Sequence, residues 1–332
     1  MLISADEAVA RLDRGDLVAL PTETVYGLAG LALSPETVKK IFALKGRSST
    51  NPLIIHLADL KSAEKLAVFN NLARQVCKVF WPGPLTIVLT KKTCVPNEIT
   101  GGGNTVAIRS PLHPLFREIL KTLGKPLAAP SANPSNRTSP TQASHIKELF
   151  GSDCPPTVDG GNCKFGLEST VLDLSAGKPR ILRYGPITPE EIENVLSIPV
   201  QTPLPERLTN NQPSKSPGSE KLHYAPRTPF FLHQTIEEIR LNRPSSEDLL
   251  LLPQKSDLPK DMDWLSSRTL YFSFHGKPEE IAFNLYKTLI QADKRNAQRL
   301  LALLPNTNTE LCLAIRDRMT RACNRNGSIA KN

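Results

Sequence analysis

One short loop of the chain combines two cations, a glycine and an amide within seven residues. Lys45 and Arg47 flank Gly46, and Asn51 follows. Glycine lets the backbone turn sharply, a lysine ammonium is a compact charge, and an arginine guanidinium is a planar fork that matches phosphate or carboxylate. The spacing therefore indicates an anion-binding loop with polyphosphate as its natural ligand. Taken alone, such a motif is more often a solvated basic turn.

Polar residues also follow short apolar runs at several places in the first two hundred residues. Residues 16–20 have the pattern of a buried strand, which leads directly into Thr22, Glu23 and Thr24. Open α/β sheets bind ligands at the carboxyl ends of their strands, although threonine also serves there as a local cap. The same combination recurs at Arg109, Ser131, Asn133, Ser169 and Arg183. Together these positions favour one concave polar site.

Two predicted strands present side chains in a direction that their alternation indicates. In residues 105–109, Thr105 and Arg109 share one face with Ala107, and the aliphatic residues between them share the other. In residues 53–57, His56 stands among aliphatic residues, where a histidine is either a satisfied core residue or a ligand contact. The pattern leaves both interpretations open.

Length and composition indicate two domains. The chain has 332 residues, of which 39% are hydrophobic, which is too long for one ordinary domain and rich enough for sizeable cores. Strand and helix patterns interleave in residues 4–196 and again in residues 229–323. Residues 199–219 are rich in Pro, Asn, Ser and Gln and lack an apolar period, which is typical of a linker.

The formal net charge of +9 favours anionic ligands or nucleic acid, although solubility alone accounts for a surplus of this size. The last helical pattern carries a basic cluster of Arg316, Arg318, Arg321 and Arg325. We interpret this cluster as a solvated face, with RNA or a protein partner as the alternative.

Several function classes lack their sequence signatures. The six cysteines form no Cys-x-x-Cys pair and no zinc-site spacing, so we expect reduced thiols in a cytoplasmic protein and no structural metal. We identify no secretory leader and no apolar run long enough to span a bilayer. The glycine triplet at residues 101–103 lacks the spacing of a Rossmann turn, and no P-loop motif occurs. A nucleotide site in this chain is therefore of another kind.

Eight motifs follow one another along the first part of the chain. They are Pro21-Thr-Glu-Thr-Val-Tyr-Gly-Leu, Lys45-Gly-Arg, Asn51-Pro-Leu-Ile-Ile-His, Trp81-Pro-Gly-Pro-Leu-Thr, Val106-Ala-Ile-Arg, Pro130-Ser-Ala-Asn-Pro-Ser, Ser139-Pro-Thr and Glu168-Ser-Thr-Val. In this order they resemble the YrdC-type domain of L-threonylcarbamoyladenylate synthases. Downstream, Ser216-Pro-Gly, His223-Tyr-Ala-Pro and the run that begins at Ala314 resemble the long form of that family. Asn136 stands where the family commonly has glycine, and we expect the turn to survive because asparagine tolerates positive φ.

The resemblance implies an α/β fold, with a YrdC-like twisted mixed sheet that carries a concave basic site and with a small Rossmann-like C-terminal domain. It divides the chain into a catalytic domain at residues 1–198, a linker at 199–227 and the C-terminal domain at 228–332. A segment that only joins two domains could have any polar sequence, whereas this linker contains two specific motifs, Ser216-Pro-Gly and His223-Tyr-Ala-Pro. We therefore predict that residues 216–226 fold over the first domain as a lid, with Tyr224 near the nucleotide, rather than forming a strap without ligand contact.

The resemblance also implies the condensation of L-threonine, bicarbonate or CO2, and ATP into threonylcarbamoyl-AMP and pyrophosphate. The product would pass to the machinery that modifies N6 of a tRNA adenosine. The carboxylate of threonine, the carbamate group and the triphosphate are all negatively charged, so the reaction requires cations, including Mg2+ with the ATP. The carbamate itself can attack phosphorus, so positioning and electrostatics replace a nucleophilic side chain.

Residue roles implied by the resemblance follow the motifs. L-Threonine is expected to contact Thr24, His56, Arg109, Ser131 and Ser169. ATP is expected to contact Arg47, Asn51, Thr105, Asn133, Thr141, Arg183 and Tyr224. Lys45 and Arg47 are the expected catalytic cations, and Arg109 the partner of the threonine carboxylate. Glu23 is either structural or metal-associated, and no protein ligand to a metal is assigned.

Two other functions fit parts of the sequence. An RNA-binding module with a basic α/β surface would bind RNA without threonine-dependent ATP turnover, but stacking aromatic residues are few. A carbamoyl-AMP-forming hydrogenase maturation protein would add an acylphosphatase segment and cysteine-paired zinc fingers, and neither occurs here. We also predict that Lys45→Ala and Arg47→Ala lower activity far more than stability, on the premise that both residues lie on an exposed loop.

Overall fold

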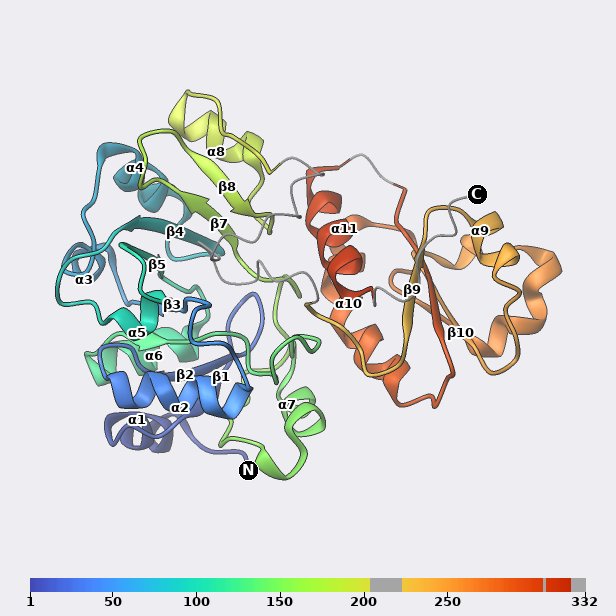
Figure 1. Ribbon diagram of the computed structural model, residues 1–332, viewed down its shortest axis with the longest axis horizontal. Helices are drawn as coiled ribbons and strands as arrows, with labels where there is room; N and C mark the ends of the chain where they lie inside the picture. The colour runs from blue at the N-terminus through green and yellow to red at the C-terminus, as the bar shows by residue number, and fades with distance from the viewer. Residues whose placement is uncertain (204–222, 307–308, 324–332) are drawn as a thin grey trace. The chain divides into compact units, whose positions relative to one another are not determined.

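The computed structural model describes residues 1–203, 223–306 and 309–323. The chain folds into two compact units, Met1–Ser135 with Ser139–Glu220, and Asn136–Thr138 with Lys221–Asn332. Each unit contains its own sheet (Figure 1). Among the described residues, no helix has both the length and the apolar character that a membrane span requires.

The first unit is built on an eight-stranded mixed sheet in the order β1-β2-β6-β3-β5-β4-β7-β8. β3 runs parallel to β5, and β4 runs parallel to β7, whereas the other neighbouring pairs are antiparallel. The strands are β1 (Val18–Leu20), β2 (Gly27–Leu31), β3 (Ile54–His56), β4 (Leu85–Thr90), β5 (Thr105–Arg109), β6 (Leu127–Ala128), β7 (Thr170–Asp173) and β8 (Arg180–Arg183). The helices are α1 (Ala5–Asp13), α2 (Pro35–Lys45), α3 (Leu60–Glu64), α4 (Asn71–Phe80), α5 (Asn97–Thr100), α6 (Pro114–Leu123), α7 (Ala143–Phe150), η1 (Gly151–Asp153) and α8 (Pro189–Leu196).

Local sequence fixes the ends of α2, and thereby the place of the first cation. The Ser34 side chain accepts a hydrogen bond from the Thr37 amide, and Pro35 occupies the first turn, where its missing N–H costs nothing. Gly46 then adopts φ 61° as the left-handed cap. Lys45 is therefore the last helical residue, and the chain turns immediately after it.

The two faces of the first sheet are covered differently. On one face, α1 and α6 pack against β1, β2 and β6 through residues such as Leu12 and Phe116. The other face carries the larger core, to which α2, α4 and α8 contribute. Over β3, β5, β4 and β7, the face opposite the larger core carries a small apolar cluster of Ile54, Val88, Ala107 and Val171, with Leu182 packed against it. That stretch of sheet carries the polar side chains described below.

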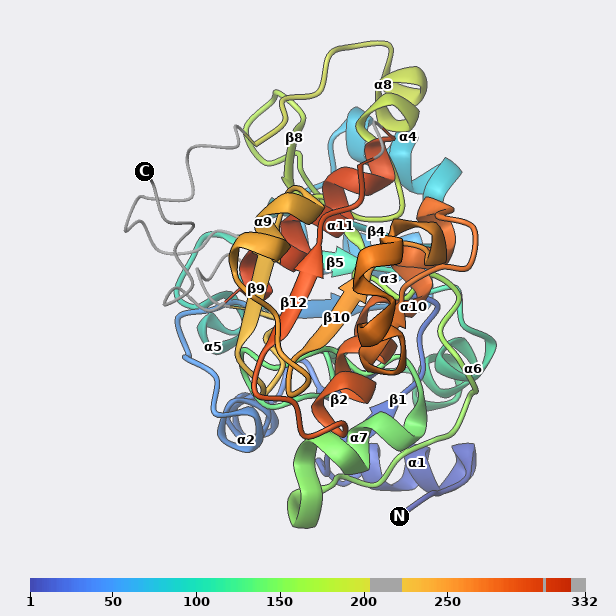
Figure 2. The same ribbon diagram turned by 90° about the vertical axis from the view of Figure 1, so that its right-hand side faces the viewer.

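The second unit contains a four-stranded parallel sheet in the order β11-β10-β12-β9. Figure 2 shows β10, β12 and β9 side by side. α10 (Pro278–Asp293) and α11 (Glu310–Ala322) lie against one face, and α9 (Ile236–Leu241) and η3 (Lys260–Arg268) against the other (Figure 1). The strands are β9 (Phe230–His233), β10 (Leu249–Leu252), β11 (Thr269–Tyr271) and β12 (Leu300–Leu303), and a short η2 (Lys255–Asp257) follows β10. Helices on both faces of a parallel sheet make the unit Rossmann-like, although β9 pairs with β12 and not with β10.

Two sequence interpretations are settled in this second unit. Asn136 adopts φ 65°, which confirms that the turn survives without glycine. The prediction that the arginines of α11 form a solvated basic face is wrong for two of them. Arg318 is fully buried, and Arg321 is ion-paired with Asp317 at 2.7 Å. α11 packs these residues inward, which the charge pattern alone did not reveal. Arg325 lies outside the described residues.

Candidate active site

His56 and Arg109 lie side by side on the sparsely covered face of the first sheet. β3 and β5 are parallel and pair Ile54 with Ala107 and His56 with Arg109, so each pair points to the same side. Val106 and Ile108 point into the larger core on the opposite face. The predicted alternation in β5 is confirmed.

Arg109 is held by three donated hydrogen bonds. Its Nε donates to the carbonyl of Gly83 at 3.1 Å, one Nη to the hydroxyl of Thr24 at 2.9 Å, and the other Nη to the carboxylate of Glu23 at 2.6 Å. A guanidinium has five N–H groups. Within the described residues, one donor on each terminal nitrogen therefore remains for a ligand, the set that a carboxylate binds in a bidentate pair.

His56 is neutral at physiological pH. Burial, with a smaller contribution from the positive charge of Arg109, lowers its pKa to about 3. One side of its ring packs on Phe116, with the ring centroids 5.3 Å apart. Its Nδ1 is buried and has no hydrogen-bond partner in the part of the chain that the structure describes. His56 therefore has both features that the sequence left open, a core contact and an unused polar atom beside Arg109.

The low pKa of His56 predicts a pH dependence of stability. The unfolded chain binds a proton at this residue near pH 6.5, whereas the folded chain does so only near pH 3, so stability falls as the pH drops below 6.5. Between pH 7 and pH 5 the loss is about 2 kcal/mol. Urea unfolding at the two pH values should show this loss in the wild type and a smaller loss in His56→Gln. An equal loss of unfolding free energy in the two proteins would contradict the assignment of this pH dependence to His56.

Ser169 and Arg183 form a second polar group at the start of β7. Arg183 Nε donates to the carbonyl of Ser169 at 3.1 Å, and its Nη2 donates to the Ser169 hydroxyl at the same distance. That hydroxyl also lies 2.8 Å from the hydroxyl of Thr86 on β4. The β4–β5 register places Ile87 opposite Ile108, so Thr86 is the residue next to Arg109 across the strands. The sheet thereby brings the Ser169 group toward the Arg109 group.

Lys45 reaches the turn of residues 131–135. Its Nζ donates to the carbonyl of Ser131 at 2.6 Å and to the carbonyl of Asn133 at 2.5 Å, and it lies 3.4 Å from the side-chain oxygen of Asn133. The carbonyl of Lys45 accepts from the amide of Ser135 at 2.6 Å. Burial lowers the pKa of Lys45, and the charge of Arg47 adds to the effect. Three acceptors occupy the three N–H groups of the ammonium, so Lys45 holds the turn.

Arg47 organises the neighbouring loop. It donates to the side chain and the carbonyl of Asn51 and, at 3.1 Å, to the carbonyl of Pro52. Arg47 is 9% exposed and Lys45 is 3% exposed. The premise that both residues lie on an exposed loop is therefore wrong, because the C-terminus of α2 turns inward at Gly46 and buries them.

Thr105 borders a cavity at the other end of the same sheet face. The cavity has a volume of about 440 Å³, and its walls include Pro52, Val88, Thr105 and Ala107 with the glycine triplet. Thr105 and Arg109 are four residues apart on one strand, which corresponds to about 13 Å. Along β5, a ligand at Arg109 and a ligand in this cavity would meet over the small apolar cluster.

Two further predicted contacts lie on other elements. Thr141 precedes α7, and its amide points to Nδ1 of His145 at 3.3 Å. Tyr224 belongs to the second unit, where its buried ring lies 5.6 Å from the ring of Tyr286 and 5.5 Å from the guanidinium of Arg318. The Tyr224 carbonyl accepts from the hydroxyl of Thr138 at 3.3 Å. In the predicted lid, residues 216–222 lie outside the described residues, so the lid and the Tyr224 contact stay predictions.

Sequence reasoning missed some partners of these residues. Thr86 was part of a recognised motif but received no role, although a threonine in an otherwise apolar strand was a usable signal. Glu168 accepts from the Ser139 hydroxyl at 2.6 Å, which joins two of the motifs. Glu23 was left between a structural and a metal-associated role, and its carboxylate is paired with Arg109. In the described residues no group of three His, Cys, Asp or Glu side chains is arranged to hold a metal ion.

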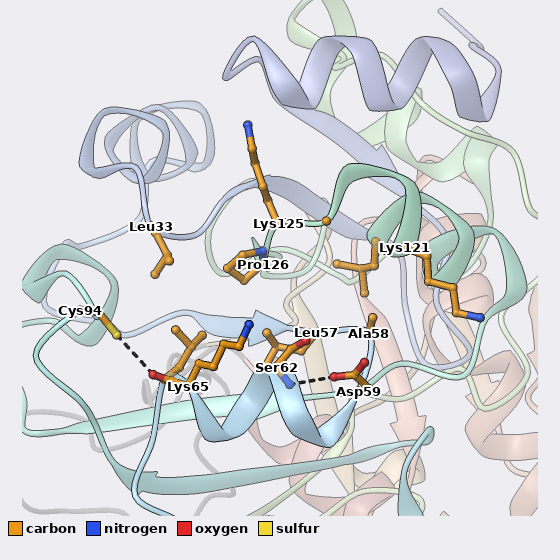
Figure 3. Close-up of a pocket in the computed structure, with 13 residues that line it drawn as sticks. Leu33, Leu57, Ala58, Asp59, Ser62, Lys65, Cys94, Lys121, Lys125 and Pro126 are labelled. Carbon is orange, nitrogen blue, oxygen red and sulfur yellow. Dashed lines mark hydrogen bonds between the residues drawn. The ribbon is translucent and has the colours of Figure 1, made fainter.

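A second cavity, of about 510 Å³, lies between α3 and the end of α6 and contains none of the predicted site residues (Figure 3). Three lysines line it, but they do not converge. Lys125 extends toward α1, where it pairs with Asp13 at 2.6 Å, and Lys121 points outward from α6 (Figure 3). Four of the predicted residues, Thr24, His56, Arg109 and Ser169, lie instead near one another on the sheet face around Arg109.

Both parts of the chain match known family models. A model named Sua5_yciO_yrdC and described as "Telomere recombination" matches residues 10–185. A second model, Sua5_C, described as "Threonylcarbamoyl-AMP synthase, C-terminal domain", matches residues 187–324. The two matches follow one another and together cover most of the chain.

Individual relatives agree with these models. The threonylcarbamoyl-AMP synthase of Pyrococcus abyssi is 38% identical over 301 residues, which cover 89% of this chain and 87% of that protein. The Bacillus subtilis protein of the same name is 43% identical over 227 residues, 68% of this chain and 65% of that protein. A crystal structure of P. abyssi Sua5 complexed with L-threonine matches with a TM-score of 0.85 and 36% identity, covering 96% of this chain and 93% of that structure.

Proposed function

The chain belongs to the threonylcarbamoyl-AMP synthase family, and from this membership we propose that it makes threonylcarbamoyl-AMP from L-threonine, bicarbonate or CO2, and ATP, with release of pyrophosphate. The product serves the N6-threonylcarbamoyladenosine modification of tRNA. The observation that carries the proposal is that both family models match one chain in succession, and that 89% of this chain is 38% identical to a threonylcarbamoyl-AMP synthase.

Threonine binds at the Arg109 end of the sheet face. Its carboxylate takes the two remaining donors of Arg109, one on each terminal nitrogen. The neutral ring of His56 beside it offers a hydrogen bond without adding a second positive charge. The hydroxyl of Thr24 contacts the same substrate. Ser131 and Ser169 complete the set of threonine contacts.

ATP lies toward the Lys45 and Thr105 end. Its proposed contacts are Arg47, Asn51, Thr105, Asn133, Thr141, Arg183 and Tyr224. The 440 Å³ cavity beside Thr105 is lined by apolar residues such as Val88 and Ala107 and by polar residues that include Thr105 and Ser175, a mixture that suits a base or a ribose. Arg47 and Arg183 supply positive charge nearer the phosphates, where arginine forks match phosphate oxygens.

Thr105 provides a local test of this placement. Thr105→Val keeps the shape of the side chain and removes one hydrogen bond, which is worth about 0.5–1.5 kcal/mol. We expect the KM for ATP to rise about two- to tenfold, with the KM for threonine unchanged. Steady-state kinetics with each substrate varied in turn measures both values. A rise in the threonine KM alone would place the nucleotide elsewhere.

The reaction needs no nucleophilic side chain. Carbon dioxide, which bicarbonate supplies by protonation and loss of water, adds to the threonine amine, and the amine releases a proton to give a carbamate. A carbamate oxygen then attacks the α-phosphorus of ATP while the bond to the β-phosphate oxygen breaks and pyrophosphate leaves. Each participant is an anion, so the energy barrier falls when cations and donors hold them at bonding distance. Arg47 supplies charge directly. Lys45 contributes charge at a distance and fixes the turn that carries Ser131 and Asn133.

Mg2+ enters this scheme as the counterion of ATP. The only carboxylate beside Arg109 among the described contacts is Glu23, and both of its oxygens are occupied by Arg109 and the amide of Leu112. No protein ligand to the ion is assigned, and the phosphates of ATP would hold it. The reaction takes place in the cytoplasm, and the product passes to the tRNA threonylcarbamoyl-transfer machinery. The alternative of an RNA-binding module is not favoured, since two of the α11 arginines are unavailable to RNA: Arg318 is buried and Arg321 is ion-paired with Asp317.

Isotope labelling tests the carboxylation directly. The purified chain is incubated with ATP, Mg2+, L-threonine and 13C-bicarbonate, and the nucleotide products are analysed by mass spectrometry. We expect an adenylate whose mass contains one carbamoyl carbon and increases by one unit with the label. An adenylate of unmodified threonine, or no adenylate, would contradict the proposed reaction.

A further inference from the structure

The loop of residues 22–25 brings two consecutive side chains to one guanidinium. The hydroxyl oxygen of Thr22 accepts from the amides of Thr24 at 3.0 Å and Val25 at 3.1 Å, and the same hydroxyl donates to the carbonyl of Val25 at 2.6 Å. These bonds fold the loop tightly. In an extended chain, neighbouring side chains point to opposite sides. Because of the turn, Glu23 and Thr24 both contact Arg109.

The carboxylate of Glu23 is fully engaged and buried. One oxygen accepts from Arg109 at 2.6 Å, and the other accepts from the backbone amide of Leu112 at 3.0 Å. The side chains of Glu23 and Arg109 are each 4% exposed. Glu23 therefore ties the end of β5 to the turn that precedes α6, and it fixes the position of one terminal nitrogen of Arg109.

Thr24 fixes the other terminal nitrogen. The Thr22 hydroxyl uses its proton on the carbonyl of Val25, so in the 2.8 Å contact between the two hydroxyls Thr24 is the donor. The Thr24 oxygen accepts from Arg109. With Glu23 on one nitrogen and Thr24 on the other, the plane of the guanidinium is set, and its two remaining donors have defined directions.

We propose that Glu23 is a positioning residue for threonine recognition, which aligns Arg109 through the buried ion pair and neutralises its charge before the substrate binds. The proposal rests on the proposed function. It extends the proposed function by stating how the site recognises threonine. The directions of two N–H groups of Arg109 select the threonine carboxylate, and net charge does not. A neutral pair also disfavours phosphate and pyrophosphate at Arg109, because an isolated buried cation would attract any anion.

Glu23→Gln tests this arrangement with little change in shape. One carboxylate oxygen becomes an NH2 group, which is a hydrogen-bond donor. This group faces either Arg109 or the Leu112 amide, which are donors as well, so one of the two hydrogen bonds cannot form. A hydrogen bond to a charged group is lost, so we expect threonine to bind about 10- to 100-fold more weakly. We expect the KM for ATP to stay within threefold, and pyrophosphate to inhibit the variant more strongly than the wild type.

The control must separate alignment from folding. Asp248 is a fully buried carboxylate paired with Arg299 at 2.6 Å in the second unit. Asp248→Asn is therefore expected to lower the melting temperature in the way that any broken buried pair does, without changing threonine binding. Glu23→Asp provides a second variant, because it keeps the charge but is one methylene too short to reach both partners. It is used with the same criteria if Glu23→Gln does not fold.

Isothermal titration of L-threonine into each full-length protein gives the dissociation constants without turnover. A threonine Kd raised tenfold or more, with the ATP KM within threefold, supports the proposal. A folded Glu23 variant with a threonine Kd within threefold of wild type overturns it, and so does an equal rise for both substrates. Wild-type protein is measured in parallel for product formation. Its failure to make product would reject the proposed function, whereas the Glu23 result concerns binding alone.

Discussion

Replacing Lys45 with methionine is expected to lower kcat about a hundredfold or more and to raise the KM of both substrates. The ammonium holds the carbonyls of Ser131 and Asn133, so its loss frees a turn whose residues contact threonine and ATP. A hundredfold corresponds to about 2.7 kcal/mol of transition-state stabilisation, which is reasonable for misplacing contacts to both reactants. Single-turnover and steady-state kinetics measure the two effects.

The same substitution is now expected to reduce stability as well. Two carbonyl groups and a side-chain amide lose their buried donor, at about 1–3 kcal/mol for each group that remains unsatisfied. The matched control is Lys40→Met on the same helix, since Lys40 also donates to a carbonyl, that of Gly15 at 2.9 Å, but is exposed and distant from the turn. Unchanged activity in Lys45→Met would show that the turn does not depend on the ammonium.

Arg109→Lys is expected to raise the KM for threonine about a hundredfold while the KM for ATP changes little. Lysine keeps the positive charge but cannot reach Gly83, Thr24, Glu23 and a carboxylate together, because an ammonium has three donors and no fork. The loss of a bidentate charged pair is worth about 2–3 kcal/mol.

Arg74→Lys is the control for this substitution, because Arg74 also pairs with a carboxylate, that of Glu64 at 2.9 Å, on the outer helices of the same unit. It should leave both KM values unchanged. If Arg109→Lys retains the wild-type threonine KM, the carboxylate binds elsewhere, and Arg109 serves only to hold the loop of residues 22–25.

Much of the fold could be predicted from the hydrophobic periodicity of the sequence and from the residues that cap helices and end strands. β5 has the predicted limits of residues 105–109, and β1 and β3 lie within the strands predicted at residues 16–20 and 53–57. β12 was missed, although the mostly polar residues 294–299 separate it from α10 and Pro305 follows it. β2 was missed since Gly27 and Gly30 weaken the strand pattern. Both glycines allow close packing, as Gly30 faces Thr37 and Leu17.

The site was only partly readable from the sequence. Residue types and motif order indicated which side chains gather, because alternation places Thr105 and Arg109 on one face. Partners across the fold were not readable. Nothing local to Lys45 shows that its ammonium ends on the carbonyls of a turn 86 residues away, or that Glu23 accepts from the Leu112 amide. Such bonds depend on which strands become neighbours, and the sequence does not state that order.

The most direct test of the central claim is pyrophosphate release by the purified full-length chain. ATP, Mg2+ and bicarbonate are held constant, and L-threonine is present, absent or replaced by L-valine, which has the same shape without the hydroxyl. We predict release that requires both threonine and bicarbonate, at a rate at least ten times that with valine. Pyrophosphate release that is the same with and without threonine would contradict the account.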